Sequence, residues 1–314
     1  MSAIFHQPHL LCNLNIGGLN MSVTFFVKNK KEIFTINQLT KLVKNLKQFT
    51  FDEDDERVDV EEIYNSKLNN VEVMLLGIYG KSARGMEVSY DEENSSYCLR
   101  VFTPASSFDW RLAIEFLKKL AGVLNAPIVC ENGTTYNIVT IESFDYVADI
   151  LSGMRALLAK KKSMESLIIT GILRPIAISY EMAEKFYKAG DKITALDNFL
   201  LKTQYVEAYS AKQMFYQKEN GEIFGVYTLT EDVPTVLPYE PYVEFKNWSI
   251  VSEVAEWRIV FIGSSDEGDF EQLGELPYNL FIEKLPKEYY YFLDAKYIVV
   301  KNLEKNDLLK LLEK

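Results

Sequence analysis

Histidine is almost missing from this chain of 314 residues. Its two histidines, His6 and His9, both lie in the first 20 residues, MSAIFHQPHLLCNLNIGGLN, a segment without Lys, Arg, Asp or Glu. The rest of the chain has no imidazole, so it cannot build a Ser-His-Asp or Cys-His nucleophile or a His-rich zinc site. From residue 21 onward, enzymes of those types are therefore excluded.

Cysteine, positive charge and long apolar runs are scarce as well. Beyond residue 20 only Cys98 and Cys130 remain, too few for a Cys-only zinc site or a CxxC pair, and we expect buried free thiols. Lys and Arg number 34 against 45 Asp and Glu, a net charge of -11 that would repel nucleic-acid phosphates. No apolar run is long enough for a membrane span. We predict a cytoplasmic protein without cofactor, metal, nucleic-acid or membrane binding.

The composition changes at Met21. Residues 1–20 are interrupted by His, Gln, Pro and Asn, so they make a poor secretory signal. The run from Ile16 to Met21 can be encoded by a purine-rich AGGAGG tract just before an ATG, as at a bacterial ribosome-binding site. We interpret residues 1–20 as a non-native or disordered leader and expect the folded chain to begin at Met21.

What the chain has in plenty is apolar material, with 48% hydrophobic and 13% aromatic residues. The alternating segments Gly85–Tyr90 and Tyr97–Phe102 predict an antiparallel hairpin, and the Asn132-Gly133 pair predicts a second one. Hairpins mixed with helices, without regular strand-helix alternation, indicate an α+β fold.

The clearest helix is expected from Ser107 to Leu124. Ser106 or Ser107 can cap it, and Asp109 suits the helix dipole in the first turn. A second helix is expected after Thr35, with Lys41, Lys44 and Lys47 along one face. The run Lys160-Lys161-Lys162-Ser163 resembles a linker, so two sub-domains are predicted, at residues 21–162 and 163–314.

Two sequences resemble known binding loops but do not match them. Gly80-Lys81-Ser82 ends like a P-loop, yet the spacing fails because Leu75 stands where the first glycine is required. The acidic run FDEDDERVDVEE lacks the glycine and the terminal glutamate spacing of an EF-hand. We therefore expect neither a nucleotide site nor a metal site there.

Two residues are candidate binding residues. Trp110 lies on the apolar stripe of the predicted helix at Ser107–Leu124. Arg174 lies in the apolar segment Ser166–Ile178, where a guanidinium requires a carboxylate or carbonyl partner. For Arg174 we favour a structural ion pair over a ligand anchor.

Four segments carry a family resemblance: RGMEVSYDEENSSYCLRVFTPASSFDW, FDYVADILSGM, GILRPI and LPYNLFIEKLP. In order and spacing they resemble an uncharacterised bacterial family labelled domain of unknown function 4299. The resemblance runs from Met21 to the end of the chain, and the Thr103-Pro104 turn followed by Asp109-Trp110 is its most specific part. It implies a cytoplasmic bacterial protein of one continuous architecture, and it supplies no catalytic residue or substrate.

Two functions remain open. An acidic chain with 19 tyrosines can present carboxylates and rings to a basic protein partner, as an immunity protein that blocks a basic toxin would. The alternative is a histidine-independent carboxylate enzyme, glycosidase-like or magnesium-dependent, for which Asp109, Asp145, Asp149 and Asp294 could converge. We favour the non-catalytic binding protein.

Overall fold

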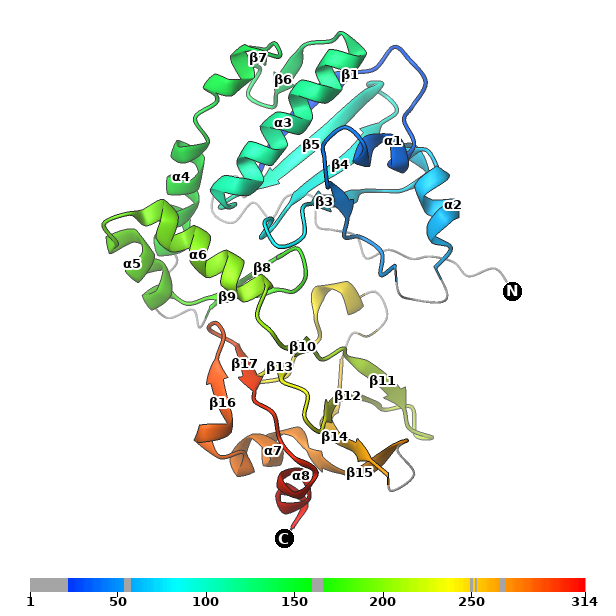
Figure 1. Cartoon of the computed structure of the whole chain (residues 1–314), viewed down its shortest axis with the longest axis vertical. Coiled ribbons are helices and arrows are strands. Elements are labelled where there is room, and N and C mark those ends of the chain that lie inside the picture. The colour runs from blue at the N-terminus through cyan, green and yellow to red at the C-terminus, as the bar shows by residue number, and fades with distance from the viewer. Residues whose placement is uncertain are drawn as a thin grey trace. The chain divides into compact units, whose positions relative to one another are not determined.

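The structure is a computed structural model that describes residues 22–53, 58–159, 166–248, 251, 253–265 and 269–313 (Figure 1). These residues form two compact units, one ending at Tyr205 and the other beginning at Val206. Antiparallel sheets and separate helices make it an α+β protein, as predicted. The expected leader lies outside the described residues.

The first unit is built on a seven-stranded sheet. Its strands, in spatial order, are β2 (Lys47–Gln48), β3 (Met74–Gly77), β4 (Met86–Asp91), β5 (Ser96–Phe102), β1 (Ser22–Lys28), β6 (Ile128–Cys130) and β7 (Thr135–Tyr136). All neighbouring strands run antiparallel, and both predicted hairpins, β4–β5 and β6–β7, are confirmed. Cys98 on β5 and Cys130 on β6 are free thiols.

Helices accompany this sheet. They are α1 (Ile36–Thr40), α2 (Val60–Asn65), α3 (Ser107–Leu124), α4 (Tyr146–Ala159), α5 (Tyr180–Lys188) and α6 (Lys192–Gln204), with short 3-10 turns η1 (Leu68–Asn70) and η2 (Thr140–Ser143). The unit also contains a separate hairpin of β8 (Leu167–Ile169) and β9 (Ile176–Ile178). Helix α3 has the predicted bounds and packs across β1 and β5 (Figure 1). Ser106 caps it, and Asn125 ends it in the left-handed conformation.

The predicted lysine-faced helix is wrong in its length. Thr35 does cap α1, in a capping box with Gln38, but the helix ends at Thr40. Asn45 takes a positive φ of 63°, and Lys47 joins β2 opposite Gly77 on β3. Pairing with the sheet therefore overrides the helical spacing, and the three lysines do not share a helix face.

The second unit contains two four-stranded sheets. One orders β10 (Tyr209–Ser210), β13 (Thr235–Pro238), β17 (Tyr297–Val300) and β16 (Tyr290–Phe292); the other orders β11 (Met214–Gln217), β12 (Ile223–Thr230), β14 (Glu256–Ser264) and β15 (Phe270–Pro277). Pairs β10–β13 and β12–β14 are parallel. Helices α7 (Tyr278–Lys284) and α8 (Lys305–Leu312) pack on β14 and β15, and the unit also has 3-10 turns η3 (Phe245–Asn247) and η4 (Lys287–Tyr289). None of the helices in the described ranges is long and apolar enough to cross a bilayer.

The two units meet in sequence at Tyr205 and Val206, later than the linker expected at Lys160–Ser163. That lysine run lies outside the described residues. The segment that follows it belongs to the first unit, because α5 packs on α4 and α6 packs on both α3 and α4.

The packing of α4 against Thr103 and Pro104 can be tested by a substitution at Gly153. A Cβ added there would lie 2.7 Å from the Pro104 nitrogen and 2.8 Å from Cγ2 of Thr103. We predict that Gly153→Ala lowers the free energy of unfolding by about 1–3 kcal/mol in urea titrations of the full chain. Gly122→Ala is the matched control, because this exposed position on α3 has open space around it, and it should stabilise by about 0.5–1 kcal/mol. Equal changes in the free energy of unfolding for the two substitutions would contradict close packing of α4 at Gly153.

Candidate functional site

The most deeply buried charges of the first unit converge at the start of α3. Asp109 has no exposed surface, and one carboxylate oxygen accepts the backbone N–H groups of Ala83 at 3.2 Å and Arg84 at 2.9 Å. The other oxygen accepts the N–H of Gly85 at 3.1 Å. The Ser106 hydroxyl donates to the same carboxylate at 2.8 Å. Asp109 thereby fixes the loop that leads into β4.

Arg84 extends this centre. Its guanidinium is buried, and it donates from Nε to the Thr170 carbonyl at 2.7 Å and from Nη1 to the Pro104 carbonyl at 2.8 Å. It also lies over the Phe102 ring, 4.6 Å from the centroid. Burial lowers the pKa of Arg84 to about 10, against the opposing charge of Asp109, so the guanidinium stays protonated at neutral pH.

Asp149 on α4 is a further charged group near Arg84, in addition to the Glu87–Arg100 pair on β4 and β5. Its carboxylate accepts the Thr103 hydroxyl at 2.9 and 3.1 Å. Burial raises the pKa of Asp149 to about 6, opposed by the Thr103 hydrogen bond and the nearby Trp110 indole, while the charge of Glu131 raises it further. This carboxyl group can therefore gain or lose a proton close to neutrality.

The four acids named from the sequence do not form one site. Asp109 and Asp149 both approach Arg84, but Asp109 is inaccessible and its oxygens are occupied by the donors described above. Asp145 is exposed and caps α4. Asp294 belongs to the second unit, where it accepts backbone N–H groups of its own turn. Within the described ranges, no three His, Cys, Asp or Glu residues group as metal ligands would.

Trp110 lies in an aromatic core. It has no exposed surface, its ring stacks on Phe144 with centroids 5.0 Å apart and on Tyr146 at 6.4 Å, and it meets Phe25 edge-on at 6.4 Å. Its buried indole N–H makes no hydrogen bond of normal geometry. This ring supports the fold beside Asp149 and is out of reach of solvent.

Arg174 lies in the turn between β8 and β9, and the expected ion pair is not there. Among the residues that the structure describes, no carboxylate lies within ion-pair distance of its guanidinium, and Nε is buried without a partner. The one hydrogen bond that the guanidinium makes with the described residues is long, from Nη1 to the Thr203 carbonyl at 3.5 Å. Within the described residues the guanidinium therefore meets one backbone carbonyl, that of Thr203 on α6, and no acidic side chain.

Both units fall within one family. The model of the family described as Domain of unknown function (DUF4299) matches residues 22–311. The chain belongs to this family. The match confirms the resemblance drawn from the sequence motifs. No curated protein and no solved structure matches the chain.

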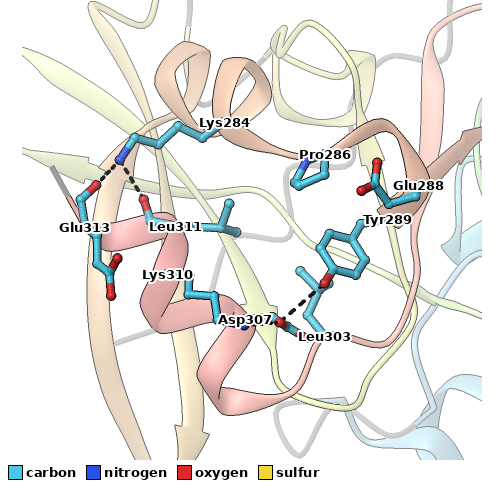
Figure 2. Close-up of a pocket in the computed structure, with 9 residues that line it drawn as sticks. All are labelled: Lys284, Pro286, Glu288, Tyr289, Leu303, Asp307, Lys310, Leu311 and Glu313. Atoms are coloured by element: carbon cyan, nitrogen blue, oxygen red, sulfur yellow. Dashed lines mark hydrogen bonds and ion pairs between the residues drawn. The ribbon is translucent and has the colours of Figure 1, made fainter.

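The second unit of this DUF4299 protein has a surface pocket of about 440 Å³ beside α7, η4 and α8 (Figure 2). Lys284 donates from Nζ to the Leu311 carbonyl at 2.9 Å and also to the Glu313 carbonyl, at the end of α8. The Tyr289 hydroxyl points to Asp307 at 3.4 Å. Because these groups are paired with the pocket's own walls, the pocket offers a ligand few free charges.

Negative charge is concentrated in the second unit. Residues 206–314 contain 11 Lys or Arg and 20 Asp or Glu, a net charge of -9, whereas residues 1–205 contain 23 and 25, a net charge of -2. The same unit exposes large aromatic side chains: Tyr209, Tyr216, Phe245, Trp248, Phe270, Tyr291 and Phe292. Whole-chain composition did not reveal this asymmetry, because it appears only once the boundary at Tyr205 is known.

The role of Asp109 can be tested by Asp109→Asn. An amide would place N–H groups against the backbone donors of the 83–85 loop and remove the largest of the negative charges that compensate Arg84. We expect a loss of about 3–5 kcal/mol in the free energy of unfolding. Asp145→Asn is the control, since Asn caps a helix as well as Asp, and it should change stability by less than about 0.5 kcal/mol.

The raised pKa of Asp149 predicts that the stability of the folded chain depends on pH. Its folded-state pKa lies above the ordinary value of 3.8, so the folded state binds the proton more tightly, and the stabilisation present at low pH is lost as pH rises through about 6. Asp149→Asn removes this titration. The difference in free energy of unfolding between Asp149→Asn and the unmodified chain should therefore shift in favour of the variant by about 1–2 kcal/mol between pH 4 and pH 7. This figure is smaller than the full effect of the pKa shift because Asp149 is partly exposed. A difference that does not change with pH would contradict the shift.

Proposed function

We propose that the chain is a non-catalytic acidic binding protein that works in the bacterial cytoplasm, with a basic protein as its partner. The observation that carries the proposal is the net charge of -9 in residues 206–314, together with the exposed aromatic side chains there. Complementary charge speeds encounter, and aromatic side chains supply affinity once water is excluded. Inhibition of a basic toxin, as by an immunity protein, is one case of this chemistry.

One aromatic pair on the second unit already contacts cations of the same chain. Tyr216 and Phe224 stack with centroids 5.5 Å apart, and Lys218 and Arg258 lie 5.8 and 5.3 Å from the Phe224 centroid. Glu256 pairs with both cations, at 3.2 Å and 3.0 Å. The faces of Phe224 are thus occupied, so a partner's Lys or Arg would bind the other exposed rings and acids.

Suitable acids are present on the same unit. Glu219, Glu240, Glu253 and Glu283 are exposed, and none of them pairs with a Lys or Arg among the described residues. Each can meet a partner's cation without first breaking an internal ion pair. These four carboxylates are the part of the charge excess most available to a partner.

Asp149 favours a second candidate function, a carboxylate-dependent enzyme. A carboxyl group with a pKa of about 6 beside another carboxylate, Glu131, can act as a general acid at neutral pH. A glycosidase or phosphotransfer activity that follows a pKa near 6 and disappears in Asp149→Asn would support this alternative.

The binding proposal is tested by changing the four available acids together. Full-length chain carrying Glu219→Gln, Glu240→Gln, Glu253→Gln and Glu283→Gln is compared with the unmodified chain in affinity capture from the native host, at low and high salt, with mass spectrometry of the bound proteins. We expect a stoichiometric basic partner whose low-salt affinity falls about tenfold in the variant.

The matched control removes the same number of charges from the first unit. Glu61, Glu62, Glu93 and Glu115 are exposed there, and their replacement by Gln should leave capture unchanged. Absence of a stoichiometric partner under both salt conditions, or equal loss in both variants, would contradict the proposal.

A further inference from the structure

The turn that carries Arg174 is held rigidly. The Gln204 side chain, which has no exposed surface, accepts the N–H groups of Leu173 at 2.8 Å and Arg174 at 3.1 Å and donates to the Arg174 carbonyl at 3.0 Å. A Cβ at Gly171 would lie 2.3 Å from that carbonyl, so only glycine fits. The N–H of Ile172 donates to the Ala83 carbonyl at 2.9 Å, beside the Asp109 centre.

The Arg174 guanidinium differs from the other half-buried or buried arginines of the unit. Arg100 pairs with Glu87, and Arg84 has two carbonyls and the Asp109 charge. The guanidinium of Arg174 makes one long hydrogen bond within the described part of the chain, to the Thr203 carbonyl. Burial lowers the pKa of Arg174, and the opposing influence is the Tyr79 phenol rather than a carboxylate. A guanidinium removed from water without a counter-ion costs stability.

An exposed aromatic side chain lies near Arg174. Tyr79 is 66% exposed and packs edge-on against Tyr205 with centroids 5.3 Å apart. The Tyr205 hydroxyl donates to the Ser82 carbonyl at 2.7 Å, which ties the end of α6 to the 79–82 loop. Lys81 is exposed in that loop, where its Nζ lies 6.0 Å from the Phe108 ring centroid. Arg174 and Tyr79 therefore lie close together as a cation and a phenol, and no acidic side chain within the described residues pairs with Arg174.

We propose that Arg174, with Tyr79, forms a binding site for the oxyanion of a small ligand, a carboxylate or a phosphate group. A planar guanidinium offers paired N–H groups that match two oxygens of such an anion. Gln204 fixes the backbone that carries Arg174, and Nε is buried, so less of the site has to become ordered on binding. The site goes beyond the binding of a basic partner, because it selects the opposite charge and lies in the first unit.

The test is the thermal unfolding midpoint, Tm, of the full chain in inorganic phosphate, in succinate and in chloride at equal ionic strength. At least one oxyanion should raise the Tm by about 2–4 °C over chloride, and the larger shift distinguishes phosphate from carboxylate. Arg174→Met should unfold in chloride at the same Tm or higher, because the uncompensated charge is gone, and should lose the oxyanion shift.

Two further variants test whether the oxyanion shift in Tm requires the guanidinium of Arg174. Arg174→Lys retains the charge without the planar fork, so the fold should persist while the oxyanion shift becomes smaller. Arg111→Met removes an exposed arginine on α3 and should keep the full shift. The proposal is overturned if neither oxyanion shifts the Tm of the unmodified chain, if Arg174→Met keeps the shift, or if it unfolds well below the unmodified chain in chloride.

Discussion

The carboxylate of Asp109 accepts three consecutive backbone N–H groups, those of Ala83, Arg84 and Gly85, in a place that water does not reach. A buried carboxylate with this many donors is compensated without solvent, and its charge also compensates the buried Arg84 guanidinium. Arg84 in turn binds the carbonyls of Pro104 and Thr170. The start of β4, the first turn of α3 and the β8–β9 hairpin are therefore joined through two side chains, and removing either charge takes compensation from the other.

The turn with Arg174 and the carboxylate of Asp149 also depend on this junction between Asp109 and Arg84. Gln204 and the Ala83 carbonyl position the turn with Arg174. Asp109 in turn accepts the N–H groups of Ala83 and of the two residues that follow it. Asp149 reaches the same centre through Thr103. The second unit has its own core and carries most of the negative charge of the chain, so the proposed binding of a basic partner rests on surface electrostatics rather than on the Asp109 junction.

Local signals predicted the local structure well. The Ser106 cap and the apolar stripe of α3 gave the correct helix bounds because both act within a few residues. The lysine-faced helix failed because β2 pairs with β3, a contact between residues far apart in sequence. For the same reason the sequence predicts Asp109 as a dipole partner of its own helix and as one of four acids that could converge, but not as an acceptor for the 83–85 loop, since the N–H groups it binds come 24 to 26 residues earlier. The sequence showed that Arg174 requires a partner, but the absence of a nearby carboxylate depends on three-dimensional packing.

Amide hydrogen exchange of the full chain, followed by mass spectrometry, tests the central role of Asp109 most directly. Peptides that cover residues 83–85 belong to a loop, yet the account predicts that their amides exchange as slowly as those of the buried strand β5, because the carboxylate holds all three N–H groups. Fast exchange there, at the rate of the exposed turn at residues 92–95, would contradict the account.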